Sequence, residues 1–173
     1  MAIAAVAISL LALGFTIASF WWLHARQGSL EAARPQAYAF ASNKVRLRLP
    51  LAFYNTGAKS LIVGDLRVVL DEEPTHSPFE WITTRAQLLP EPGDGFAFAT
   101  PFAVEGRSAK EVVVEFGDEI QWSPSPASKH RLRLQALIHP AEDWEDVVTF
   151  DWWAPPSEEA MTQYLTHRNR PQN

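Results

Sequence analysis

Two patterns of hydrophobic and polar positions divide this chain. From residue 2 to residue 23 no side chain has a formal charge, and Ser9, Thr16 and Ser19 are the polar residues in the run AIAAVAISLLALGFTIASFWWL. From residue 45 onwards apolar and polar residues alternate, which is typical of strands buried on one face. The sequence therefore predicts one apolar helix followed by a β-rich domain.

The apolar run has the length of a membrane span. Its 22 residues would form a helix of about 33 Å at about 1.5 Å per residue, and the hydrocarbon core of a bilayer is about 30 Å thick. Trp21, Trp22, His24 and Arg26 follow, an aromatic and basic boundary suited to the lipid headgroups. We predict a transmembrane anchor over residues 1–26, these four residues at the membrane interface, and the lipid bilayer as a partner.

The apolar run has two other interpretations, a cleaved signal peptide and a buried core helix. A cleaved signal peptide has a basic N-terminal region and small residues at its cleavage site, whereas no Lys or Arg precedes this run and Phe20-Trp21-Trp22 stands near its end. A buried core helix is the other alternative, but a soluble domain seldom needs a helix that is apolar on every face. Both alternatives fit the sequence less well than an anchor.

Charge near the span predicts its orientation. Arg26 and Arg34 follow the span, so the positive-inside rule places the C-terminal domain in the cytoplasm, with the extracytoplasmic side as the alternative because two charges are a small bias. Residues 24–48 contain five Lys/Arg and one Asp/Glu, and residues 49–173 contain ten and nineteen, which sum to the net charge of −5. Residues 24–48 are expected to form either a basic collar that attracts anionic lipid or a solvated strand face.

The remainder is predicted to be an all-β domain, an immunoglobulin-like β-sandwich of seven to eight antiparallel strands. The expected strands are 45–53, 62–70, 80–88, 95–104, 109–116, 129–139 and 145–152. Pro101 places the 95–104 segment at a sheet edge or a bulge. The predicted organisation is a linker at 27–36, the sandwich at 37–154, and a tail at 155–173 with a short helix capped by Ser157 and a frayed end from residue 167.

The segment LPLAFYNTGAKSLIVGDLRVVL (residues 49–70) resembles the opening of small bacterial immunoglobulin-like domains, in which a strand ends in an Asn-x-Gly turn and a second apolar strand follows. The layout of a span and a β-rich domain over residues 1–120 resembles uncharacterised bacterial single-pass membrane proteins. The resemblance implies a fold and a membrane location. It transfers no activity, because its motif is a structural turn.

Composition and motifs exclude several classes of catalytic and binding function. The absence of Cys excludes disulfides, thiolate nucleophiles and Cys-ligated zinc, and the acidic balance argues against nucleic acid as a partner. The five histidines lack metal-binding spacing, and G-x-S-x-G is absent. The acidic clusters at 71–73 and 142–146 suit solvated turns better than calcium loops, and 92–95 suits a hairpin turn. We predict a non-enzymatic protein with no catalytic residue, cofactor or metal.

Basic and aromatic residues are the remaining candidates for a binding surface. Lys44-Arg46-Arg48 and Lys129-Arg131-Arg133 could form a basic strip, although pairing of such cations with Glu111 and Glu115 is favoured. Trp152 and Trp153 must point to opposite faces of a strand, so one of them is expected either to be covered or to bind a partner.

The function predicted from these features is a membrane-anchored interaction or accessory module with an unidentified protein partner. The alternative is an extracytoplasmic carbohydrate- or cell-wall-binding module that uses exposed tryptophans. Homo-oligomerisation through Gly14 and Ala18 is left open, because small residues four apart occur by chance in an alanine-rich helix.

Overall fold

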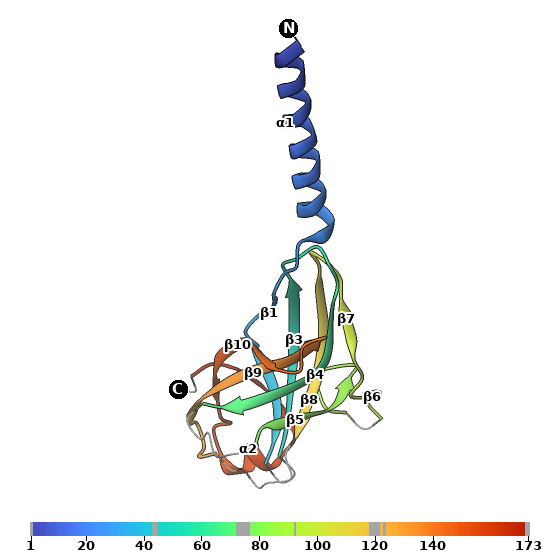
Figure 1. The fold of residues 1–173 in the computed structure, drawn as a ribbon. Coiled ribbons are helices and arrows are strands. Elements are labelled where there is room, and N and C mark those ends of the chain that lie inside the picture. The colour runs from blue at the N-terminus through green and yellow to red at the C-terminus, as the bar shows by residue number, and fades with distance from the viewer. Residues whose placement is uncertain are drawn as a thin grey trace.

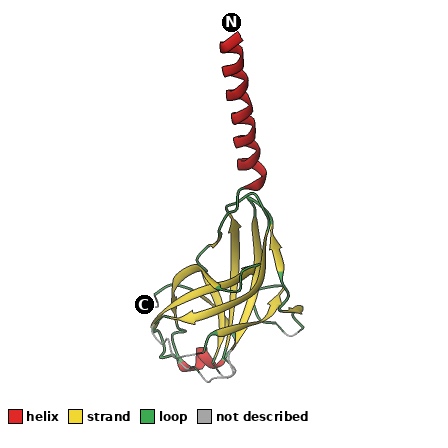
Figure 2. Ribbon diagram, in the orientation of Figure 1, coloured by secondary structure: helices red, strands yellow, loops and turns green. Residues whose placement is uncertain are grey.

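A long helix stands at one end of a β-rich domain (Figures 1 and 2). The structure is a computed structural model and describes residues 2–42, 45–71, 77–91, 93–117, 122 and 124–171. The helices are α1 (Ala2–Phe20), the π-helix η1 (Trp21–Ala25) that continues it, and α2 (Glu158–Thr162). The described residues form eleven strands: β1 (Leu30–Ala32), β2 (Ala37–Ala41), β3 (Arg46–Asn55), β4 (Leu61–Leu70), β5 (Phe79–Arg85), β6 (Phe96–Phe98), β7 (Phe102–Val104), β8 (Ala109–Gly117), β9 (Lys129–His139), β10 (Trp144–Trp153) and β11 (Leu165–Arg168).

The apolar helix packs against no other element in the part of the chain that the structure describes. Residues Ile3–Ala25 form one helical segment that is long and apolar enough to cross a membrane, and the apolar window tested is 0% buried. This agrees with the predicted N-terminal helix. The alternative of a core helix is wrong, because a core helix would pack against the domain.

The strands are antiparallel and follow the order β10-β9-β4-β5-β8-β3-β2-β11, with β1 on β3, β6 on β5 and β7 on β4. The sheet turns a corner between β4 and β5, where only Arg67↔Glu80 and Val68↔Phe79 are paired. As a result β4 and β9 run across β3 and β8 (Figure 1), and the sheet curls into a half-barrel around one core. The prediction of an antiparallel all-β domain is confirmed.

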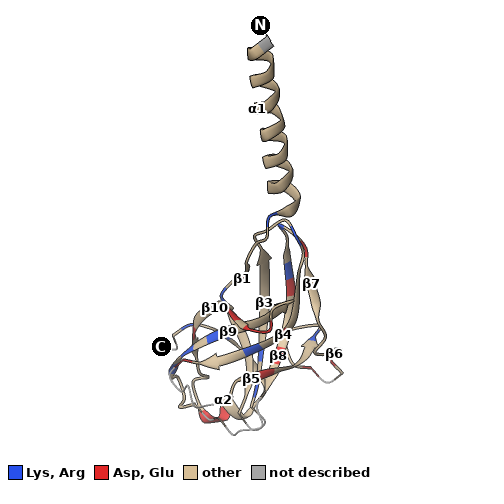
Figure 3. Cartoon of the chain, viewed as in Figure 1, with Lys and Arg blue, Asp and Glu red and all other residues tan. Residues whose placement is uncertain are grey.

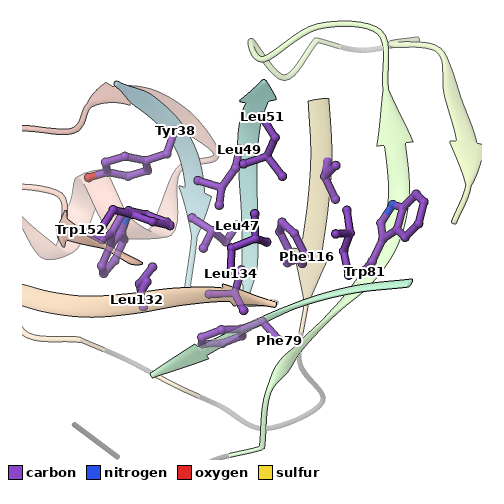
Figure 4. Close-up of a cluster of buried hydrophobic side chains, with 14 of the residues drawn as sticks. Tyr38, Leu47, Leu49, Leu51, Phe79, Trp81, Phe116, Leu132, Leu134 and Trp152 are labelled. Atoms are coloured by element: carbon purple, nitrogen blue, oxygen red, sulfur yellow. The ribbon is translucent and has the colours of Figure 1, made fainter. Parts of the chain in front are cut away.

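The core fills the space enclosed by the curled sheet. Leu47, Leu49 and Leu51 alternate along β3 with outward-facing residues, and they meet Leu132 and Leu134 of β9 (Figure 4). Aromatic side chains complete the same cluster: Tyr38, Phe40, Phe53, Phe79, Trp81, Phe116, Trp122, Phe150 and Trp152. Period-two alternation in long strands thus produces the buried surface that holds the fold together.

Polar side chains join the two outer strands of the sheet. The Trp153 amide donates to the Asn169 side-chain oxygen at 3.1 Å, and the Asn169 side-chain nitrogen donates to the carbonyl of Asp151 at 2.8 Å. The Tyr38 hydroxyl donates to the carbonyl of Trp153, and burial raises the pKa of this tyrosine. These contacts satisfy backbone groups at the β10 edge that would otherwise be unpaired.

Several predicted boundaries are wrong. The expected linker at 27–36 contains β1, whose Leu30 is buried, and the expected frayed end contains β11, which pairs with β2. The expected strand at 95–104 is two strands, β6 and β7, which separate around Pro101 and pair with β5 and β4. The count of seven to eight is therefore too low. Strands of three or four residues are too short to show a period, and their pairing depends on distant segments. The short helix and its Ser157 cap are confirmed, since the Ser157 hydroxyl accepts from the Ala160 amide at 3.2 Å.

Candidate functional site

The four predicted interface residues lie where the anchor meets the domain. Trp21, Trp22 and His24 are exposed on η1, and Trp21 and Trp22 are 55% and 53% accessible. The His24 ring lies 4.9 Å from the ring of Phe20. Arg26 ends the helix in an extended conformation, and its guanidinium lies 4.4 Å above the Trp22 ring. The structure thus gathers these residues around the last helical turn.

Two glycines hold the anchor against the domain. A Cβ on Gly28 would lie 1.8 Å from the amide nitrogen of Gly57, and a Cβ on Gly57 would lie 2.1 Å from that of Gly28. The Ala58 amide donates to the carbonyl of Arg26 at 2.8 Å, and the Thr56 amide donates to that of Ser29 at 3.1 Å. This close backbone approach tolerates no side chain, so glycine is required on both sides.

Asn55 organises the turn that carries Gly57. The Asn55 side-chain oxygen accepts from the Gly57 amide at 2.9 Å, and its nitrogen donates to the carbonyls of Lys59 at 2.8 Å and Val104 at 3.0 Å. The side chain is buried, with 3% of the residue accessible. The Asn-x-Gly turn predicted from the sequence is therefore also a connector between the β3–β4 and β7–β8 ends of the domain.

Arg107 adds a third segment to this arrangement. Its guanidinium donates to the carbonyl of Trp22, and its backbone amide donates to the carbonyl of Gly57 at 2.8 Å. We call the residues that make these contacts the anchor junction: Trp22, Arg26, Gly28, Ser29, Asn55, Thr56, Gly57, Ala58 and Arg107. Backbone hydrogen bonds connect the segment after the helix with the β3–β4 turn, and that turn with the β7–β8 turn. No local sequence signal links Arg107 or Gly28 to this site.

The predicted basic collar at residues 24–48 is wrong as a continuous feature. Arg46 and Arg48 begin β3, whereas the anchor junction lies at Asn55, where that strand ends. Asn55 comes seven positions after Arg48, about 23 Å along the strand at about 3.3 Å per residue. Lys44 lies outside the described residues. The collar fails because β3 begins at the end of the domain remote from α1 and reaches the α1 end only at Asn55 (Figure 1).

Arg48 instead forms a buried charge cluster at the opposite end of β3. Its guanidinium donates to Asp94 at 2.7 Å and to Glu115 at 3.1 Å, and all three side chains are at most 4% accessible. It also donates to the carbonyl of Gln87 at 2.8 Å. The predicted pairing of such a cation with Glu115 is confirmed. Asp94 was expected only as a turn residue, and it reaches inward to cover the arginine.

Glu115 has further donors in the same cluster. The Tyr164 hydroxyl donates to Glu115 at 2.7 Å, Arg85 donates at 3.1 Å, and Arg46 lies 3.8 Å away. Burial raises the pKa of Glu115, but the hydrogen bonds from Tyr164, Arg85 and Arg48 and the charge of Arg85 outweigh it, so the pKa lies below its usual value. Burial, followed by the hydrogen bond to the carboxylate, raises the pKa of Tyr164. The cluster ties the loop after β5 and the segment after α2 to the sheet.

The second predicted row of cations, on β9, pairs with aspartates. Lys129 lies 2.9 Å from Asp151, and Arg133 lies 3.1 Å from Asp71 and 3.2 Å from Asp146. Arg131 lies 3.6 Å from Asp71. The two rows therefore form no common basic strip, because each is neutralised by carboxylates of neighbouring strands or loops.

The tryptophan surface predicted at Trp152 and Trp153 is wrong for Trp152. This side chain is 0% accessible and lies in the core, 5.3 Å from the Tyr38 ring and 5.4 Å from the Trp122 ring (Figure 4). Trp153 is half-buried, with the Lys129 ammonium 5.8 Å from its ring. Trp144 is also half-buried beneath the Arg67 guanidinium at 4.2 Å. All five tryptophans of the domain are within the described residues: Trp81, Trp122 and Trp152 are buried, and Trp144 and Trp153 are half-buried.

The exposed aromatic surface lies on β6 instead. Phe96 and Phe98 are 59% and 76% accessible, and their rings pack edge to face at 5.9 Å. The Arg85 guanidinium lies 5.0 Å from the Phe96 ring. A hollow of about 550 Å³ opens beside Arg85 on the outer face of the sheet, and its lining is Pro50, Leu51, Ala52, Thr84, Arg85, Ala86, Glu111, Val112 and Val113. This surface was not predicted, although the FAF pattern at residues 96–98 is visible in the sequence.

Histidine and carboxylate groups give no metal centre in the part of the chain that the structure describes: no three His, Asp or Glu side chains there are placed to share an ion. His130 and His139 lie at opposite ends of β9, as predicted. Ser128 and His130 are in contact at 2.7 Å, but the serine hydroxyl donates its proton to the carbonyl of Ser125. His130 Nε2 must therefore donate to the serine, which is the reverse of a nucleophile and its base. Residues 72, 73 and 76 lie outside the described residues.

Comparisons with known proteins add little. No protein-family model matches the sequence, and no curated protein matches it. A crystal structure of a protein from Archaeoglobus fulgidus is similar over 74% of this chain and 94% of its own, with a TM-score of 0.32 and 11% sequence identity. A similarity this low carries no argument about fold or function.

Proposed function

We propose that this chain is a single-pass, membrane-anchored interaction module of a bacterial type, with a non-enzymatic, immunoglobulin-like β-domain that binds a protein partner. The observation that carries the proposal is the anchor junction. An exposed apolar helix continues into a domain that holds it through the Gly28–Gly57 contact and the Arg107–Trp22 hydrogen bond. A protein gains from such a junction when the domain must be presented at a set position above a membrane.

Retention of the anchor is supported by the same contacts. Cleavage of a signal peptide near Trp22 would remove the carbonyl that Arg107 binds and the ring that lies beneath Arg26. The exposed Trp21 and Trp22 suit the headgroup layer. We propose the cytoplasmic side for the domain, following Arg26 and Arg34, with the extracytoplasmic side as the alternative. Protease digestion of intact cells and of inverted vesicles distinguishes the two.

The edge strand β6 is the proposed contact for a partner. In the described residues β6 pairs with β5 alone, so its other edge is free to accept an extended segment of another protein. Phe96 and Phe98 would then supply apolar contacts, and the hollow beside Arg85 would accept side chains of the partner. Self-association through Gly14 and Ala18 stays a prediction.

Extraction tests the anchor. We expect the full chain to stay in the membrane pellet after alkaline carbonate treatment. The double variant Leu11→Arg and Leu13→Arg should be released, since each arginine costs about 2.5–3.5 kcal/mol at the centre of a span. The matched variant Leu11→Phe and Leu13→Phe should stay. Recovery of the unaltered chain in the soluble fraction would contradict the proposal.

Site-specific crosslinking tests the partner contact. A photoreactive phenylalanine at position 98, in the full chain within its own membranes, should give a product of defined mass that disappears with Phe96→Ser. Position 165 is the matched control. Leu165 is an exposed apolar residue on β11, the last strand of the sheet order, and it does not neighbour β5 or β6 in that order. Equal products at both positions, or none at position 98, would reject β6 as the contact.

A further inference from the structure

Three basic residues surround the point where the anchor enters the domain. Arg26 ends the helical segment, Lys59 lies in the turn between β3 and β4, and Arg107 lies in the turn between β7 and β8. The hydrogen bonds of Ala58 to Arg26 and of Arg107 to Gly57, both 2.8 Å, bring these segments together. Figure 3 shows basic residues at this end of the domain. We call Arg26, Lys59 and Arg107 the basic rim.

The charges of the rim are available to a ligand. Lys59 and Arg107 are exposed and Arg26 is half-buried, and no ion pair within the described residues involves any of the three. The exposed carboxylates next to these segments are Glu105 in the β7–β8 turn and Glu31, which pairs opposite Tyr54, so three positive charges and two negative charges leave this end at +1. Arg107 gives one donor to Trp22 and keeps the others free, in a planar arrangement that suits phosphate.

The rim lies at the height of lipid headgroups if the helix spans a bilayer. Exposed tryptophans favour the headgroup layer, and the guanidinium of Arg107 binds the backbone of one of them, Trp22. Attraction between charges in salt solution extends over about 8–10 Å. Arg46 and Arg48 lie more than 20 Å farther along β3 by the strand rise of about 3.3 Å, so they add nothing to this attraction.

Two exposed glutamates lie at the opposite end of the domain. Helix α2 begins with Glu158 and Glu159, and it lies at the end of the domain remote from α1 (Figure 3). An anionic membrane surface would attract the rim and repel the α2 end. Both effects favour the same orientation, with the long axis of the domain away from the membrane.

We infer that the basic rim binds the phosphates of anionic phospholipids and thereby holds the domain upright on the membrane. This inference rests on the proposed function, because it requires that α1 spans the bilayer. It adds a lipid class and three binding residues, two of which come from loops remote in sequence from the span.

A single spin label can report the distance between the rim and the lipid. The chain has no Cys, so Ser60→Cys, next to Lys59 and exposed, gives one labelling site in the full protein. The labelled chain is reconstituted into vesicles of phosphatidylcholine, with or without a third of phosphatidylglycerol, that contain a nickel-chelating lipid. Collision of the label with the nickel headgroups is measured at low salt and at about 1 M salt, where the screening length falls to about 3 Å.

We expect a several-fold higher collision rate in the anionic vesicles at low salt, and loss of the difference at high salt. Lys59→Glu should abolish most of the difference. Lys129→Glu makes the same change of charge at the start of β9, far from the rim, and should preserve it. Equal collision rates in both lipids for a chain that floats with the vesicles would overturn the rim and leave the anchor standing. A chain that does not float would overturn the proposed function, and the rim with it.

Discussion

The guanidinium of Arg107, in the turn between β7 and β8, donates to the backbone carbonyl of Trp22, 85 residues earlier in the chain. A carbonyl in the last turn of a helix has no partner within that helix. The domain therefore supplies a donor that the end of the anchor requires. This contact, together with the one between Gly28 and Gly57, joins an apolar helix to a β-domain without a flexible linker.

Gly28→Ala should open the anchor junction. The new Cβ would lie 1.8 Å from the Gly57 nitrogen, so the two backbones must separate and their hydrogen bonds must lengthen or break. We expect faster tryptic cleavage after Arg26 and a midpoint of thermal unfolding in detergent several degrees lower, consistent with a loss of about 1–3 kcal/mol. Gly95→Ala is the matched control, because a Cβ there meets nothing within 4 Å. Equal cleavage rates for both variants would contradict this account of the junction.

Arg48→Met should destabilise the domain strongly. It leaves the buried carboxylates of Glu115 and Asp94 without their shared cation, and breaking a buried ion pair in this way costs about 3–5 kcal/mol. Arg46→Met should cost at most about 1 kcal/mol, because Arg46 is 34% accessible and 3.8 Å from Glu115. Urea unfolding followed by tryptophan fluorescence measures both. A similar loss in the two variants would show that the cluster does not depend on Arg48.

Stability should fall in two steps as the pH is lowered. Burial lowers the pKa of His167 below its ordinary 6.5, so the unfolded chain binds a proton first and stability decreases below pH 6.5. The pKa of Glu115 is lowered from its ordinary 4.5, so its contribution is complete above pH 4.5 and is lost as the pH falls from there through the folded value. The free energy of unfolding, measured by urea titration between pH 8 and pH 3, gives both windows.

The variant His167→Phe separates the two steps. Phenylalanine preserves an aromatic ring next to Tyr38, whose ring centroid lies 5.4 Å from that of His167. It should remove the decrease below pH 6.5 and leave the decrease below pH 4.5 unchanged. A variant that retains the first step would assign that step to another group.

Trp152→Ala should cost about 3–5 kcal/mol, because the removed side chain is completely buried among aromatic rings. Trp153→Ala should cost clearly less, since its ring is half-buried next to Lys129. Paired urea unfolding curves give the difference. Equal and small losses of stability in the two variants would indicate that Trp152 lies at the surface. The sequence alone left open which of the two tryptophans faces the core.

The long strands could be predicted because their signal is local. The expected strand at 129–139 coincides with β9, whose alternating Leu132, Leu134 and Ala136 are buried in the core. Strand β11 offers no such signal: its four residues are mostly exposed, and they pair with β2 more than a hundred positions away. The hydrophobic period alone cannot identify a strand that forms because it pairs with a segment distant in the sequence.

The residues of the candidate sites differ in the same way: some have a local sequence signal, and others are brought together only by the fold. Alternation places Arg48 on the outer face of β3, and the outer position is right, but Asp94 and Tyr164 cover it there. The Asn55 turn was visible as an Asn-x-Gly motif, whereas its contact with Gly28 needed the folded chain. Trp21 and Trp22 were recognised from composition at the end of the span, and the basic residues of the rim at Lys59 and Arg107 were not, because sequence distance hides them.

The close approach of Gly28 to Gly57 has a consequence for how a partner is encountered. A domain on a long tether samples a hemisphere of positions, and a partner of any height can reach it. If α1 spans a membrane, as we propose, β6 would travel with the membrane at nearly constant height, and the search for a partner would become two-dimensional diffusion within one thin layer above the lipid. Proteins whose complementary segment lies at another height would be rejected before any side chain of the two surfaces meets.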